Sequence, residues 1–177
     1  MNFYGRRFNL YLLLAGTLVL VSGCASFKNK DKQLAALRIH IESTTNVAGN
    51  NETVPVIRAA PVMVTIAKEA ILTEANIAAA RLIETPGGFA VEVKFNQSGS
   101  LTLEQFSAMN PGKHFVVFGQ WDDKLKDGRW LAAPSINRRM AGGILAFTPD
   151  ASRAEAEQLV KGLNLAAKKY ESERIKQ

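Results

Sequence analysis

The sequence contains a single cysteine and only two histidines among its 177 residues. One cysteine cannot form an intrachain disulfide, so a disulfide scaffold and a zinc site made of several cysteines are both excluded. His40 and His114 each lack a second histidine, a cysteine or a carboxylate at the spacing of a metal site. We therefore predict no metal site and interpret both histidines as surface or edge residues.

Groups arranged for catalysis are also scarce. Asp122 and Asp123 are adjacent acids in a loop rich in lysine, which is typical of a solvated turn, whereas a catalytic pair needs one pKa raised by burial. Ser135 has no nucleophile-elbow glycines around it. We predict no catalytic residue, no cofactor and no small-molecule substrate, with a hydrolase built on His114 and the two acids as an alternative hypothesis.

Long apolar runs are missing after residue 24, so no later segment is predicted to span a membrane. The apolar run from Leu10 to Val21 follows Arg6 and Arg7, with no acidic residue before it. Its length of about a dozen residues is too short for a hydrocarbon core of ~30 Å, but it suits the core of a signal peptide. We therefore assign residues 1–23 to a leader, whose removal lowers the formal net charge from +6 to +4.

The small residues Val21, Ser22 and Gly23 stand directly before Cys24, where a signal peptidase requires small side chains. The pattern resembles the lipobox of bacterial lipoproteins, which implies cleavage before Cys24 and acylation of its thiol and new amino group. Two or three acyl chains make a durable membrane anchor, whereas one chain is marginal. Because residue 25 is Ala rather than Asp, the resemblance favours the outer over the inner membrane, with the protein facing the periplasm.

Alternating hydrophobicity predicts several strands beyond a tether at 24–36. The segment "LRIHIES" from residue 37 alternates strictly, and "VPVIR" from residue 54 is its expected partner, with Pro55 at an edge or bulge. Further strands are predicted at 62–67, in a hairpin over 81–95, in "HFVVFGQW" from residue 114 and in the short segment "LAFT".

Two helices are predicted from capping patterns. Thr102 to Gln105 matches a capping box that opens a short helix, which Asn110-Pro111-Gly112 closes. Ser152 to Glu155 opens the second, with a possible break near Leu163 and Asn164 because Gly162 precedes them. The predicted fold is α+β, a mainly antiparallel sheet with two helices packed on one face. It occupies 37–165, before a charged helical tail at 166–177.

Five segments in order resemble one family. They are "KEAILTEANI", "VEVKFNQSGS", "FSAMNPGKHFVVF", "LAAPSI" and "GGILAFTPDASRAEAEQLVKGL", which begin at residues 68, 91, 106, 131 and 142. Together they are similar to the head subdomain in the first periplasmic region of the SecD protein-export family. The resemblance covers a core at 62–165, leaves the strands at 37–57 as additions, and implies an α+β head module on a lipid anchor rather than an energy-coupled translocase.

A partner-binding surface is predicted around the charged loop after residue 120. Its candidate residues are Trp121, Asp122, Asp123, Arg129, Trp130, Arg138 and Arg139. Aromatic residues beside arginine are favoured in protein interfaces, although both tryptophans could instead hold the loop base on the sheet. The expected partner is an envelope protein or exported polypeptide; alternatively, a basic face including Arg138 and Arg139 binds anionic lipid or glycolipid. We expect no nucleic-acid partner.

Overall fold

The computed structural model describes residues 35–44, 49–121 and 128–176, which all lie in one compact unit, Lys32–Gln177. Its elements are β1 (Ala36–Ile41), β2 (Asn51–Val56), β3 (Val62–Ala67), η1 (Glu74–Asn76), β4 (Ile77–Thr85), β5 (Gly88–Phe95), α2 (Gln97–Met109), β6 (Phe115–Gln120), β7 (Gly128–Ala132), β8 (Ile144–Phe147) and α3 (Arg153–Arg174). No helix within these residues is long and apolar enough to cross a membrane.

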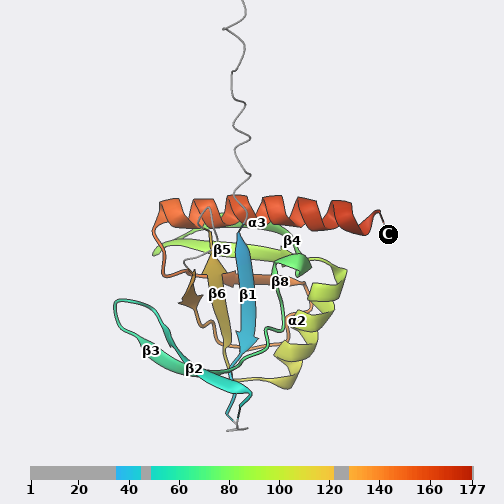
Figure 1. Ribbon diagram of the computed structural model, residues 1–177. Helices are drawn as coiled ribbons and strands as arrows, with labels where there is room; N and C mark the ends of the chain where they lie inside the picture. The colour runs from blue at the N-terminus through green and yellow to red at the C-terminus, as the bar shows by residue number, and fades with distance from the viewer. Residues whose placement is uncertain (1–34, 45–48, 122–127, 177) are drawn as a thin grey trace, which may run out of the picture. The chain divides into compact units, whose positions relative to one another are not determined.

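The strands form three antiparallel sheets with the orders β1-β6-β7, β2-β3 and β4-β5-β8. Figure 1 shows α3 running alongside β4 and β5, while α2 lies at the end of β5 from which the chain enters this helix. The prediction of a mainly antiparallel α+β fold with two helices is confirmed, and the strands are divided among separate sheets.

The sheet β1-β6-β7 is buried on both faces, and β6 shows how. Successive side chains of a strand point to opposite faces. Phe115 and Val117 therefore enter the main core, which α3 and the sheet β4-β5-β8 complete. Val116 faces the other way, into a smaller core with four aliphatic residues of β2 and β3. The β2-β3 hairpin thus covers the face of the middle sheet that the helices leave open (Figure 1).

Strand β1 pairs with β6, not with the segment from residue 54 as the sequence suggested. That segment forms β2 and pairs with β3 instead. Strand β7 was not predicted, because we interpreted residues 121–130 as a charged loop. Alternating hydrophobicity identifies a strand and its buried face but carries no information about a partner that is distant in sequence.

Helix α2 begins five residues before the predicted start at Thr102. Asn96 is its N-cap, and the Asn96 side chain accepts a hydrogen bond from the N–H of Gly99 at 2.9 Å. Thr102 lies inside the helix, where its hydroxyl donates to the carbonyl oxygen of Ser98. A Cβ on Gly99 would lie 2.9 Å from that of Asn76, so glycine here permits close packing rather than ending the helix.

Helix α3 begins as predicted and does not break in the middle. Ser152 is the N-cap of a complete capping box with Glu155. The helix continues through Gly162, which is buried, and through Leu163 and Asn164 to Arg174. The break that the glycine suggested is absent because this part of the helix is held by the core and by β4.

Candidate functional site

Part of the predicted site lies outside the described residues. This applies to Cys24 and to the signal-peptidase residues Val21, Ser22 and Gly23, and equally to Asp122 and Asp123 of the charged loop. The described candidates are the two tryptophans and three arginines, which fall into two separate places.

Trp121, Arg129 and Trp130 lie at the base of the loop and face the protein interior. Trp121 is 9% exposed, and the Arg129 guanidinium lies 4.6 Å from the centre of its ring. The Trp130 ring contacts His40 edge-on at 5.3 Å and Phe118 at 5.1 Å. These contacts match the alternative in which both tryptophans hold the loop base on the sheet.

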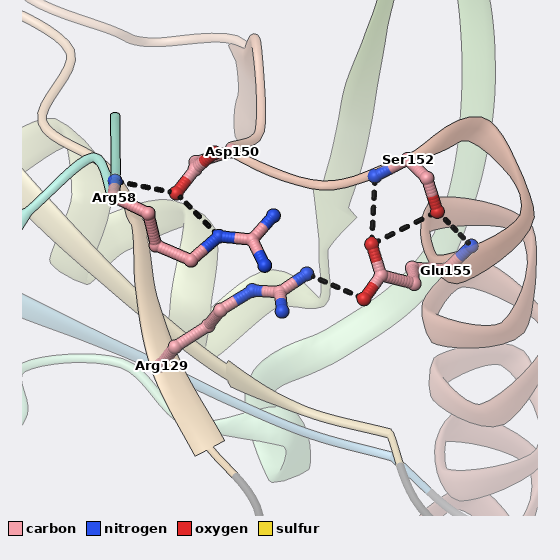
Figure 2. Close-up of polar contacts among 5 residues, drawn as sticks. All are labelled: Arg58, Arg129, Asp150, Ser152 and Glu155. Carbon is pink, nitrogen blue, oxygen red and sulfur yellow. Dashed lines mark hydrogen bonds and ion pairs between the residues drawn. The ribbon is translucent and has the colours of Figure 1, made fainter. Parts of the chain in front are cut away.

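Arg129 belongs to a group of ion pairs that fastens β7 to the start of α3 (Figure 2). Its Nη2 lies 2.7 Å from Oε1 of Glu155, and the other carboxylate oxygen of Glu155 accepts bonds from the Ser152 N–H and hydroxyl. Beside it, Asp150 accepts bonds from both the N–H and the Nε of Arg58. The backbone N–H of Arg58, followed by its guanidinium, lowers the pKa of Asp150 despite partial burial.

Glu155 should make stability depend on pH. Burial alone would raise its pKa, but the hydrogen bonds from Ser152 and the ion pair with Arg129 outweigh burial and lower the pKa to about 2. Because the folded pKa lies below the unfolded value of 4.5, the contribution to folding is present above pH 4.5 and is lost as pH falls towards 2. With the side chain 31% exposed and screened by solvent, we expect about 2 kcal/mol at pH 7.

Urea unfolding of the wild type and Glu155→Gln at pH 7, 4 and 2.5 measures this contribution. The difference between the two proteins should be largest at pH 7 and, with a folded pKa of about 2, should fall to about a quarter of that value by pH 2.5. A difference that stays constant over this range would contradict the assignment, because other acids affect both proteins equally.

The histidines are placed differently from one another. His40 lies on the edge strand β1, which agrees with the prediction of an edge position, but the residue is only 7% exposed and its Nδ1 lies 2.9 Å from the Ala67 oxygen. The expected outward-facing orientation is therefore wrong. The tertiary cover from β3 and Trp130 buries what alternation suggested was the solvent face. His114 is partly exposed and pairs through Nδ1 with Glu42 at 2.7 Å. No group of three metal-ligating side chains occurs within the described residues.

The remaining arginines lie on the connection between β7 and β8. Arg138 and Arg139 are exposed. Arg139 forms an ion pair with Glu104 of α2, whereas Arg129 pairs with Glu155 of α3. The structure therefore places Arg129 and Arg139 in different contacts, one with α3 and the other with α2.

Sheet edges are the other candidate binding feature, since an edge adds a strand only where its outward N–H and C=O groups are free. On β1, the Ile39 N–H donates to Leu72 at 2.9 Å, and the Ile39 oxygen accepts from Ile71 at 2.8 Å. On β4, the Asn164 amide bonds both backbone groups of Ala80, at 2.9 and 2.8 Å. Both edges are covered at these residues.

The edges of β7, β3 and β2 are also covered or blunted at single residues. Asp150 donates its N–H to the Leu131 oxygen of β7 at 2.7 Å, and Ser43 donates to the Thr65 oxygen of β3 at 2.9 Å. On β2, Pro55 takes an outward position and has no N–H to offer. Its predicted place on an edge strand is confirmed.

Strand β8 has an open edge. Phe95 of β5 donates to the Gly143 oxygen at 2.9 Å, and bonded pairs alternate along an antiparallel ladder. Leu145 and Phe147 therefore bond to β5, while Ile144 and Ala146 direct their N–H and C=O groups away from it. No backbone bond to these outward groups is recorded from the described part of the chain.

A hollow of about 530 Å³ adjoins this edge. It lies between β8 and the connection that precedes it, and its lining residues are Pro134, Ser135, Arg138, Arg139, Met140, Ala141, Gly142, Ile144, Leu145 and Ala146. The connection is fixed to α2, because the Met140 N–H donates to the Ser107 hydroxyl at 2.9 Å. Two predicted residues, Arg138 and Arg139, thus border a strand edge that sequence reasoning did not identify.

Comparison with known proteins places this geometry in a family. The family described as "SecDF, P1 head subdomain" matches residues 50–167. This range runs from β2 into α3 and leaves out β1. A search among curated proteins finds no significant match.

Two solved structures share the fold. One, described as "Structure and function of a membrane component SecDF that enhances protein export", is 20% identical with a TM-score of 0.53, over 75% of this chain and 63% of that one. The other, "Crystal structure of SecDF in Super-membrane-facing form", has the same identity, TM-score and cover of this chain. The match spans only 19% of that second chain.

Proposed function

Because the chain belongs to the SecDF P1 head subdomain family, we propose that it is a non-enzymatic module that binds extended polypeptide segments in protein export or envelope assembly. The observation that carries the proposal is the open edge of β8. In this function the segment lies in the hollow beside β8 and adds one strand to the sheet β4-β5-β8.

Strand addition uses main-chain hydrogen bonds, which every polypeptide offers regardless of its sequence. Ile144 and Ala146 together provide two N–H donors and two C=O acceptors on the open edge. The net free energy of each hydrogen bond is only about 1 kcal/mol, because water is displaced from both partners. An edge of this length therefore supports weak and reversible binding. Such binding suits a protein that must release its segment.

We place the protein at the periplasmic face of the outer membrane, where acyl chains on Cys24 would hold it. The support is the short apolar run followed by small residues and the sole cysteine. An anchored module meets polypeptides near the membrane at a high effective concentration, which compensates for weak binding at a single edge.

A proline at residue 146 tests the proposal. The full-length protein is extracted from membranes in detergent, and its binding of a labelled ten-residue peptide of alternating valine and threonine is followed by fluorescence anisotropy. Ala146→Pro removes an outward N–H without touching the bonds to β5, as Pro55 does on β2, and should weaken binding about fivefold, which corresponds to one hydrogen bond of about 1 kcal/mol. Ala146→Ser keeps the N–H and is the matched control.

Wild-type binding that survives in Ala146→Pro would exclude strand addition at β8, and no wild-type binding would overturn the proposal. The far-UV circular dichroism of both variants must match the wild type. The mass of the same preparation tests the anchor, because an unmodified Cys24 thiol or an uncleaved leader contradicts the proposed location.

A further inference from the structure

The hollow beside β8 has a one-sided charge. Two of its ten lining residues are arginines, and none is an aspartate or glutamate. Glu104 neutralises Arg139 from α2, with that arginine still 67% exposed. Arg138 forms no ion pair with any residue that the structure describes. A segment placed along β8 would therefore meet at least one guanidinium that has no ion-pair partner among residues 35–44, 49–121 and 128–176.

We propose that the hollow beside β8 selects extended segments that carry carboxylate side chains, with Arg138 as the residue that recognises them. This inference rests on the proposed function and adds to it a preference among polypeptides. The backbone groups of Ile144 and Ala146 hold the segment, and the guanidinium distinguishes its side chains.

The spacing of a strand explains how one arginine can be selective. Ile144 and Ala146 lie two residues apart, roughly 6.8 Å along a strand, so three residues of a segment engage both. Side chains alternate between faces, and a carboxylate at every second position is directed to one side only. A guanidinium binds a carboxylate through two parallel hydrogen bonds between opposite charges. A side-chain amide of equal size is uncharged and cannot form this pair.

Selection rather than tight binding is the expected outcome of such a contact. An exposed arginine gains only a modest advantage from one carboxylate, and salt reduces it. The same hollow should disfavour segments rich in lysine, because a second cation meets Arg138 without compensation. Polypeptides of opposite charge are thus separated while neutral segments still bind.

Three labelled ten-residue peptides test this inference against the full-length protein in detergent. Each alternates valine with one polar residue, which is glutamate, glutamine or lysine. At low salt we expect the glutamate peptide to bind about fivefold more tightly than the glutamine peptide, and the lysine peptide to bind more weakly than both. Raising the salt to 0.5 M should remove the difference.

The variant Arg138→Gln should abolish the preference for glutamate and leave binding of the glutamine peptide unchanged. Lys161→Gln, which removes an exposed cation on α3, is the control and should keep the preference. Equal binding of the glutamate and glutamine peptides by the wild type, lost in Ala146→Pro, would overturn this inference and leave the proposed function intact.

Failure of all three peptides to bind would overturn the proposed function as well. Vesicles of phosphatidylglycerol supply an anionic competitor of a different class. If they displaced the glutamate peptide through Arg138 while neutral phosphatidylcholine vesicles did not, and bound more tightly than the peptide, a lipid ligand would replace the acidic segment.

Discussion

Leu163→Ala should lower the free energy of unfolding by about 3 kcal/mol, since truncation removes buried methyl groups and leaves a cavity. Leu163 lies in the middle of α3, is 0% exposed and belongs to the main core. The most extensive contact of α3 is with strand β4. Because a strand held in a sheet cannot easily move into the cavity, we expect little relaxation around it. The loss should therefore fall near the centre of the range for such substitutions.

Urea unfolding followed by far-UV circular dichroism measures this loss. Lys161→Ala is the control, because it shortens an exposed side chain two residues away in the same helix and should change stability by less than about 0.5 kcal/mol. A similar small change for Leu163→Ala, with an unaltered dependence on urea, would mean that this part of α3 does not pack on the core.

The helix starts show how far local sequence determines structure. The side chains of Ser152 and Glu155 each accept a hydrogen bond from the other residue's backbone N–H. Because both residues lie within one turn, the capping box was sufficient to predict the start of α3. For α2, Thr102 offered a similar pattern, but Asn96 caps the chain first. Choosing between two adequate caps requires knowing that the turn at Gly99 packs against Asn76, which is distant in sequence.

Strand partners and buried polar residues depend on the whole fold. The sequence predicted the hairpin of β4 and β5, whose short turn brings neighbouring strands together. It did not predict that β1 pairs with β6, because many strands offer the same alternation. His40 illustrates the consequence, since its face becomes buried only when the β2-β3 hairpin covers the middle sheet.

The candidate site was predictable only in part for the same reason. Arginines at 138 and 139 are visible in the sequence, but their proximity to a free edge depends on which outward backbone groups other segments occupy. The other sheet edges differ from that of β8 because other segments bond to them or a proline blunts them. Tertiary contacts from Asp150 and Asn164 decide the outcome on two of them.

Asn164 therefore has a structural role that its position in a helix does not suggest. Its amide accepts the Ala80 N–H and donates to the Ala80 oxygen, which satisfies both outward groups next to the bulge in β4. Asn164→Ala removes both bonds and leaves partly buried backbone groups without partners. We expect a loss of about 2 kcal/mol by urea unfolding at pH 7.

Asn164→Asp separates the two bonds. A carboxylate still accepts the Ala80 N–H, but it cannot donate to the Ala80 oxygen and instead repels it, so at pH 7 the loss should reach at least the ~2 kcal/mol of Asn164→Ala. Below the pKa of the introduced carboxyl, the protonated group can donate again, and the deficit relative to the wild type should shrink. The deficit of Asn164→Ala should not change with pH, and equal pH dependence of the two variants would exclude the amide clamp as the reason that β4 is closed while β8 stays open.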